Sequence, residues 1–297
     1  MYVTGGLEPT RHERLPPVKA EARGSEVRAL SCPTVDRARR HLFEFNDSPW
    51  APVALRETVI EALSRTLAWG RILEGLVPPF REFLRRAAVD EVLDLCSGAG
   101  GPAAILAGEI ARAGARPPRF LLTDLQPHPE AWARLRAERP EVIDFVPEPV
   151  DATRIPEDVG RGRARIVINA LHHFEPALAG TILRGACRQS PGVFVAEGFE
   201  RRLLGFVPFA AAGIPALLAN PILTPTHQVK KALLTWLTPA AFAVSTWDGL
   251  VSTQRVYTEG ELRAMVAPLG SAFAWEYGTY EFSPLGRGYY FFGVRAQ

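Results

Sequence analysis

The feature that most constrains the fold is an apolar strand that runs directly into a glycine-rich turn at residues 91–101, Glu-Val-Leu-Asp-Leu-Cys-Ser-Gly-Ala-Gly-Gly. The apolar residues suit a buried parallel strand, and the glycines let a ligand approach the backbone without a Cβ atom in the way. Pro102 follows where a first helical residue belongs, since its missing N–H would be unpaired there. Strand, turn and helix in this order predict the nucleotide-binding edge of a parallel α/β sheet.

Polar residues mark the ends of four further predicted strands, which cover residues 119–124, 146–150, 164–170 and 193–196. Asp124 ends the first of these, where a carboxylate can accept hydrogen bonds from ribose hydroxyls. The other ends carry Asp151, Asn169 with a histidine pair behind it, and Glu197. Because the carboxyl ends of parallel strands share one edge of a sheet, these residues predict a single crevice there.

These motifs resemble those of the class I S-adenosylmethionine (SAM) dependent methyltransferases. Residues 93–100 look like the first motif of the family, 123–125 the second, 150–153 the third, and 169–174 (Asn-Ala-Leu-His-His-Phe) the fourth. The resemblance spans about residues 88 to 200 by motif. It implies an α/β fold with a Rossmann-like, mostly parallel seven-stranded sheet and helices on both faces. An N-terminal helical cap and a helical insert after the fifth strand would be additions to it.

The resemblance also implies the cofactor, SAM, with S-adenosylhomocysteine as the product. Asp94 and the backbone of the glycine turn would hold the methionine part, and Asp124 would bind the ribose. Asp151 with Ala152 would contact the adenine, and Asn169 would offer its main chain near the sulfonium. The implied cofactor site consists of Asp94, Cys96, Ser97, Gly98, Gly100, Asp124, Leu125, Asp151, Ala152 and Asn169.

A nicotinamide enzyme is the alternative, because Gly98, Gly100 and Ala103 also satisfy the dinucleotide pattern. Pro102 removes one helix-terminal N–H that a pyrophosphate would use. Asp94, which precedes the glycines, suits a cofactor that carries an ammonium and a sulfonium better than an anionic one. The sequence therefore favours SAM.

Composition narrows the partners and the compartment. The 297 residues, 47% of them apolar, suffice for one α/β domain with additions, and a net charge of +2 does not call for nucleic acid. Cys32, Cys96 and Cys187 lack metal-ligand spacing, which predicts a reducing, cytoplasmic compartment. No clustered Asp/Asn set follows Asn169, so no metal is expected. The N-terminus lacks the features of a secretion signal, so none is expected.

The chain is predicted to divide into three parts. Residues 1–35 mix Pro, Gly and charges without a period, which is typical of a mobile tail. Residues 36–88 predict an N-terminal helical cap, because apolar residues recur there at three- and four-residue steps. Residues 89–297 predict the SAM-binding domain, with an apolar insert at 200–257.

The insert allows three interpretations. Between residues 203 and 247 the only full charges are Lys230 and Lys231. Four prolines, at 208, 215, 221 and 225, are expected to break this stretch into pieces too short for a straight spanning helix, which needs about 20 apolar residues. A helical lid over an apolar substrate is favoured, ahead of a dimer contact and of a monotopic patch on a membrane surface.

After the insert, the sequence predicts a helix start and a final hairpin. Thr258 and Glu261 have the spacing of a capping box, and Asp248 and Arg255 are expected to form an ion pair that anchors the lid. Residues 273–280 and 288–294 alternate, which predicts two antiparallel strands joined by a long loop.

Aromatic residues in the cap and the insert are candidates for the substrate pocket. In the cap, two Phe and a Trp with Asn46 and Asp47 could line a pocket for a flat organic molecule, or could instead form a hydrophobic staple before the helix at Pro52. The candidate substrate contacts are Phe43, Phe45, Asn46, Asp47, Trp50, Trp236, Trp247 and Tyr257.

The histidine pair is the candidate for chemistry. Methyl transfer from a sulfonium needs mainly alignment of the acceptor and exclusion of water, and a base near neutral pKa helps. Neighbours at a strand end point to opposite faces, so at most one of His172 and His173 would reach the substrate. His172 is preferred and Glu197 is the second choice. Local packing of the pair and catalysis by alignment alone both stay open.

The sequence therefore predicts a methyltransferase that acts on an apolar, aromatic small molecule in natural product biosynthesis, with a carbon, nitrogen or oxygen acceptor. A membrane-associated enzyme acting on a lipid or quinone is one alternative. A non-catalytic SAM-binding protein is another, and a homodimer is open.

Overall fold

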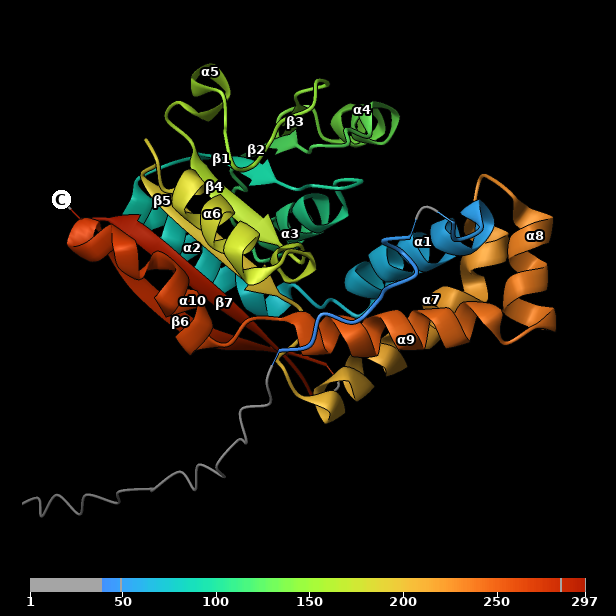
Figure 1. Cartoon of the computed structure of the whole chain (residues 1–297). Helices are drawn as coiled ribbons and strands as arrows, with labels where there is room; N and C mark the ends of the chain where they lie inside the picture. Colours follow the sequence, from blue (N-terminus) through green and yellow to red (C-terminus); the bar gives the residue numbers. More distant parts are fainter. Residues whose placement is uncertain (1–38, 49, 284, 297) are drawn as a thin grey trace, which may run out of the picture. The chain divides into compact units, whose positions relative to one another are not determined.

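A seven-stranded sheet forms the centre of this computed structural model, which describes residues 39–48, 50–283 and 285–296 (Figure 1). The strand order is β3-β2-β1-β4-β5-β7-β6, and β7 runs antiparallel to both of its neighbours. The strands are β1 (Glu91–Leu95), β2 (Arg119–Thr123), β3 (Ile143–Phe145), β4 (Ala164–Ile168), β5 (Gly192–Glu197), β6 (Phe273–Phe282) and β7 (Gly286–Arg295). The mostly parallel seven-stranded sheet that the resemblance implied is confirmed. The tail expected at residues 1–35 lies outside the described residues.

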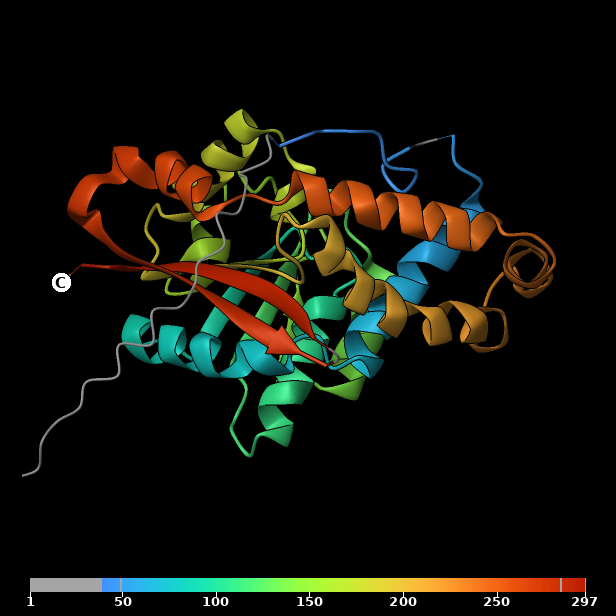
Figure 2. The same cartoon turned by 90° about the horizontal axis from the view of Figure 1, so that it is seen from below.

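Helices cover both faces of the sheet, as expected. Figure 2 shows α2 (Val77–Ala87) and α3 (Gly101–Arg112) on one face and α6 (Pro176–Ala186) and α10 (Glu259–Val266) on the other. Because both faces are covered, every residue of β4 and β5 is buried, which explains their continuous apolar runs. Shorter elements complete this part of the fold: η1 (Glu74–Leu76), α4 (Pro129–Glu138), α5 (Glu157–Gly160), η2 (Leu171–His173) and η5 (Ala267–Ala272).

The remaining helices form a group beyond the ends of the strands (Figure 1), which we call the helical body. It consists of α1 (Val53–Trp69), η3 (Leu203–Gly205), α7 (Phe206–Leu223), α8 (Gln228–Ala232), η4 (Leu233–Leu237) and α9 (Ala240–Arg255). A small separate core joins α1, α7 and α9 through Leu55, Val59, Ala62, Leu217, Ala241 and Val244. The first cap helix and the insert thus pack together, although most of the sheet lies between them in the sequence. The second cap helix, α2, packs on the sheet instead, with Phe83 against Phe194.

The helix α7 differs from the sequence-based expectation. It is continuous over 18 residues with Pro215 and Pro221 inside it, whereas the prolines were expected to break the run. Pro208 lies in the first turn, where the N–H groups lack helical partners anyway, and packing against α1 and α9 supports the helix past the other two. By length and composition alone, α7 is long and apolar enough to cross a membrane, and 33% of it is buried.

Two smaller predictions were also wrong. The third strand is β3 at 143–145 rather than residues 146–150, because Pro147 and Pro149 lack the N–H groups that a ladder needs. The final strands are longer than predicted, so their connection is short. The capping box is confirmed: the Glu261 N–H donates to Thr258 Oγ1, and the Thr258 N–H donates to Glu261 Oε2.

Candidate functional site

The glycine turn at the end of β1 leaves its backbone open. Gly98 and Gly100 have φ angles of 51° and 82°, in the left-handed region that favours glycine. A Cβ atom on Gly98 would meet nothing within 4 Å, whereas one on Gly100 would lie 2.8 Å from side-chain atoms of Leu122 and Leu135. The backbone conformation favours glycine at both positions, Gly100 is also closely packed, and Gly98 leaves room for a ligand. The buried Trp132 fixes the turn, because its Nε1–H donates to the Gly98 carbonyl at 2.8 Å. No local pattern singles out this Trp.

Two acids flank the turn, as the sequence predicted. Asp94 is 3% exposed on β1, and burial raises its pKa to about 7; the Ser97 hydroxyl opposes this shift and the Asp124 charge adds to it. Asp124 accepts hydrogen bonds from the Gly98 N–H at 2.8 Å and the Gln126 N–H at 2.9 Å. The end of β2 is thereby tied to the turn, with a carboxylate beside the open glycine.

The loop after β3 reaches the same edge. The Val150 N–H donates to the Asp124 carbonyl at 2.8 Å, which places Asp151 beside the end of β2. Asp151 is exposed and accepts from the N–H and hydroxyl of Thr153, and Ala152 is buried. Leu125, the next residue along from Asp124, is exposed.

Asn169 connects the ends of β4 and β5. Its φ of 54° is left-handed, its N–H donates to the Ala196 carbonyl at 2.8 Å, and its Oδ1 accepts from the Gly198 N–H at 2.7 Å. This geometry continues the row of polar groups from β1 and β2 toward the fifth strand.

His172 and Glu197 form a buried pair at the end of this row. His172 Nδ1 lies 2.8 Å from Glu197 Oε2, and the His172 backbone N–H donates to Oε1 at 3.1 Å. Both side chains are almost fully buried. A carboxylate on Nδ1 selects the tautomer with a proton there, so Nε2 carries the free lone pair. The two residues favoured by the sequence are thus one unit, an oriented base.

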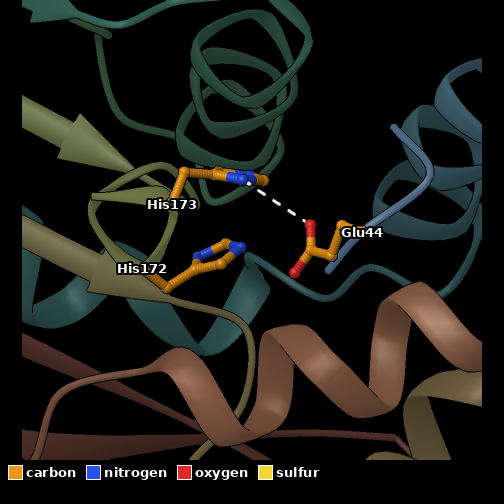
Figure 3. A group of neighbouring side chains, drawn as sticks. All are labelled: Glu44, His172 and His173. Atoms are coloured by element: carbon orange, nitrogen blue, oxygen red, sulfur yellow. Dashed lines mark ion pairs between the residues drawn. The ribbon is translucent and has the colours of Figure 1, made fainter. Parts of the chain in front are cut away.

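His173 lies beside His172 rather than on the opposite face. The ring centroids are 4.2 Å apart with an interplanar angle of 34°, and Figure 3 shows one ring above the other. The expectation of opposite directions was wrong, because these residues form the 3-10 turn η2 and the strand alternation does not apply.

A carboxylate from the cap faces this pair. Glu44 is 2% exposed, and its Oε2 lies 3.7 Å from His173 Nδ1 (Figure 3). Its Oε1 accepts from Ser252 Oγ at 2.8 Å and pairs with Arg255 at 3.2 Å. Burial raises the pKa of Glu44 to about 7, against the lowering effects of His173 and Arg255. Sequence reasoning missed Glu44, although it lies between two aromatic residues that were singled out.

The segment 39–48, which we call the strap, is held on α9. Asp248 accepts from the backbone N–H groups of Phe45 and Asn46 at 2.8 and 3.1 Å. Arg255 donates to Asp47 at 2.7 Å, in addition to its pair with Glu44. The expected Asp248–Arg255 ion pair is therefore replaced by two separate attachments of the strap.

The structure gathers four of the candidate substrate residues. The rings of Phe43, Phe45 and Trp50 have centroids 5.0–5.8 Å apart, and Trp247 Nε1 donates to the Phe43 carbonyl at 2.9 Å. Trp247 also lines a shallow hollow of about 450 Å³ along α9. Trp236 and Tyr257 have other roles: the first donates to the Leu218 carbonyl on α7, and the second is buried and donates to the Phe174 carbonyl. A larger hollow of about 690 Å³ lies among charged residues of η1, α2 and α3.

The helical body touches the histidine pair through aromatic rings. Phe199, just after β5, makes an edge contact with His172 at 5.7 Å between ring centroids. Phe209 of α7 packs edge-on against Phe199 at 5.6 Å. The insert therefore reaches the candidate site through Phe199.

No family model matches the chain, and no curated protein matches it. Solved structures that resemble it include the methyltransferase domain of bacterial CtHen1, at 12% identity and a TM-score of 0.45, covering 75% of this chain and 99% of that one. A putative O-methyltransferase from Nostoc punctiforme matches at 16% identity and a TM-score of 0.46, covering 87% and 64%. Magnesium protoporphyrin IX methyltransferase from Synechocystis, solved with bound SAM, matches at 12% and 0.42, covering 76% and 81%.

Proposed function

We propose that this protein is a SAM-dependent methyltransferase that acts on an apolar, aromatic small molecule. The observation that carries the proposal is the buried His172–Glu197 pair at the sheet edge that also bears Asp94, the open Gly98 and Asp124. The edge has a nucleotide-type turn at one end and a base at the other. This arrangement suits a cofactor that is held by the turn and whose reactive group extends toward the base.

The chain's own groups match the charges of SAM. Asp94 would pair with the ammonium of the methionine part, Asp124 would accept from the ribose hydroxyls, and Asp151 with Ala152 would border the adenine. Bound SAM supplies a methyl group on a sulfonium that is already activated for displacement. The other residues of the implied set, Cys96, Ser97, Gly100, Leu125 and Asn169, would shape the same edge.

The histidine pair would handle the proton. As the acceptor oxygen or nitrogen takes the methyl group, its proton would pass to His172 Nε2, and neutral S-adenosylhomocysteine would leave. Glu197 would hold the ring and stabilise the imidazolium that forms. A hydroxyl or N–H acceptor therefore fits better than an unactivated carbon. The aromatic group of Phe43, Phe45, Trp50 and Trp247 would hold a flat acceptor, which is consistent with natural product biosynthesis.

Calorimetric titration with S-adenosylhomocysteine, with NADH as the control ligand, tests the cofactor first. We expect micromolar binding of the former and none of the latter. Binding of NADH alone would overturn the proposal. Turnover with labelled SAM and a panel of phenols, naphthols and aromatic amines then tests the acceptor class. SAM binding with no transfer to any of them would favour a non-catalytic SAM-binding protein.

A membrane-associated enzyme acting on a lipid or quinone is the second candidate. The specific observation is an apolar stripe on one side of α7, where Val207, Ile214, Leu218 and Ile222 are all exposed. Co-sedimentation with anionic vesicles would support it if Leu218→Glu abolishes sedimentation. Leu178→Glu is the matched control, because Leu178 is similarly exposed on α6 of the sheet part.

A further inference from the structure

The group in Figure 3 has the composition of a metal site as well as that of an acid–base site. Glu44, His172 and His173 each offer one ligand atom, and these atoms all lie within 4.8 Å of one another. They come from the strap and from η2, so the fold alone brings them together. That separation in sequence is why the spacing of residues predicted no metal.

Each of these side chains is already oriented by a neighbour. Glu197 holds His172 Nδ1, which leaves Nε2 as the free donor atom. Ser252 and Arg255 hold Glu44 Oε1, which leaves Oε2 on the side of His173. A carboxylate on the second nitrogen of a histidine is the usual support of a metal ligand.

His173 has an unsatisfied nitrogen in this group. Within the described part of the chain, its Nδ1 is buried and makes no hydrogen bond. Asp47 Oδ1 and Glu44 Oε2 lie 3.4 and 3.7 Å away. A buried nitrogen without a partner is costly unless something else satisfies it, and a cation between these groups would do so.

We propose that Glu44, His172 and His173 bind a divalent transition-metal ion. Two imidazoles and one carboxylate suit zinc and its neighbours in the first transition row, whereas calcium and magnesium prefer oxygen ligands. Three protein ligands leave coordination positions for water or an acceptor. With bonds of about 2.0–2.2 Å, tetrahedral ligand atoms lie roughly 3.4 Å apart, so the side chains would move closer together by up to about 1.4 Å.

The charges around the group favour a cation. Glu44, Asp47 and Glu197 contribute three carboxylates, and Arg255 is the guanidinium that pairs with two of them. When these three acids are ionised, their negative charge exceeds the single positive charge of Arg255. A bound cation would neutralise the remaining negative charge.

The ion would give the site a second way to activate an acceptor. With the ion bound, His172 Nε2 would be a ligand and not the base, so an acceptor hydroxyl at an open position, its pKa lowered by the ion, would release its proton to solvent before it takes the methyl group. This consequence rests on the proposed methyltransferase function, but ion binding itself does not.

Titration of the metal-stripped 297-residue chain with Co²⁺, followed by visible absorption and by competition with Zn²⁺, tests the site. We expect about one equivalent of Co²⁺ with the absorption bands of a low-coordinate site. Glu44→Gln and His173→Gln should each abolish the bands. Glu197→Gln should weaken binding by about 10–100-fold, because it removes the support of His172. His227→Gln is the matched control, since His227 pairs with Glu57 on the helical body and should bind Co²⁺ like the parent protein.

Absence of Co²⁺ binding by the parent protein, or bands that persist in both Glu44→Gln and His173→Gln, would overturn the site. Thermal melts of each variant establish that it is folded, and His173 is the most exposed of the three, so its variant should be the least disruptive. Calorimetry with S-adenosylhomocysteine on the same samples separates the two proposals. If the protein binds S-adenosylhomocysteine but not Co²⁺, the metal-site proposal is wrong and the proposed function stands. If it binds Co²⁺ but not S-adenosylhomocysteine, the proposed function is wrong and the metal-site proposal stands.

Discussion

The carboxyl edge of the sheet and the helical body bury their apolar residues very differently. In the sheet, side chains such as Val167, Phe194 and Val195 are fully buried between two helical layers. In the helical body, a core of six residues joins three helices, and side chains such as Ile222 and Leu237 are largely exposed. The first region can hold charges at fixed positions, and the second presents an adaptable apolar surface. We infer that cofactor recognition and base orientation reside in the sheet edge, and acceptor recognition in the helical body together with the strap that is attached to it.

The difference between the two regions predicts which variants reduce turnover or cofactor affinity and which reduce the stability of the fold. The largest effect should come from His172→Ala, which removes the proposed base. Turnover should fall by about 100- to 10,000-fold, while affinity for S-adenosylhomocysteine stays within a few-fold. Steady-state kinetics and calorimetry measure the two quantities, with His227→Ala as the control. Equal turnover in the parent and His172→Ala proteins would return this histidine to a structural role.

The attachment of the strap to α9 predicts the second-largest effect, a loss of stability. Arg255→Met breaks a pair in which both Arg255 and Glu44 are about 2% exposed, so stability should fall by about 3 kcal/mol. Arg263→Met removes an exposed pair with Glu259 and should cost under about 1 kcal/mol. Denaturant unfolding measures both. A similar loss in the two variants would mean that the strap adds nothing to the stability of the fold.

Cofactor affinity should respond to the acid on β2 more than to the acid after β3. Asp124→Ala removes the proposed ribose partner and leaves the Gly98 N–H without its acceptor, so S-adenosylhomocysteine affinity should fall by about 10–100-fold. Asp151 is exposed and bonded locally to Thr153, so Asp151→Ala should change affinity by only a few-fold. Calorimetry ranks the two. A larger loss of affinity in Asp151→Ala than in Asp124→Ala would mean that the cofactor does not bind at the end of β2.

The smallest predicted effect is a pH dependence that originates at Asp94. With a pKa of about 7 raised by burial, Asp94 is mostly protonated at pH 6 and mostly ionised at pH 7.5. Because we propose that the ionised form pairs with the ammonium of SAM, affinity for S-adenosylhomocysteine should rise by about eightfold over this range. In the free protein the sign is reversed: a folded-state pKa above the unfolded value means that stability falls as pH rises from about 4 to 7. Asp94→Asn should flatten both profiles, and a profile that persists in this variant would have another source.

The residues of the sheet edge could be predicted from the sequence because each of its motifs is a short, continuous stretch of chain. The strand and the glycine turn are continuous over residues 91–101, Asp124 directly ends the next apolar run, and the capping box at Thr258 joins residues three positions apart. The helical body was less readable. The continuity of α7 depends on packing against α1 and α9, which outweighs the local effect of Pro215 and Pro221.

The candidate site shows the same division. His172 and Glu197 were named from their positions at strand ends, but their pairing is a tertiary contact. Glu44 lacked any local signal, because its partners Ser252 and Arg255 come from the far end of the insert. The two histidine rings lie side by side because the residues form a 3-10 turn, which a strand-based expectation did not include.

The ring contacts from Phe209 through Phe199 to His172 have a mechanical consequence. The imidazole is held by Glu197 at Nδ1 and contacts Phe199, which in turn contacts Phe209 of α7. A displacement of α7, by an acceptor or by a surface bound to its exposed stripe, would therefore be expected to change the packing around the nitrogen that we propose as the proton acceptor. The insert would thereby influence the rate of methyl transfer as well as bind the acceptor.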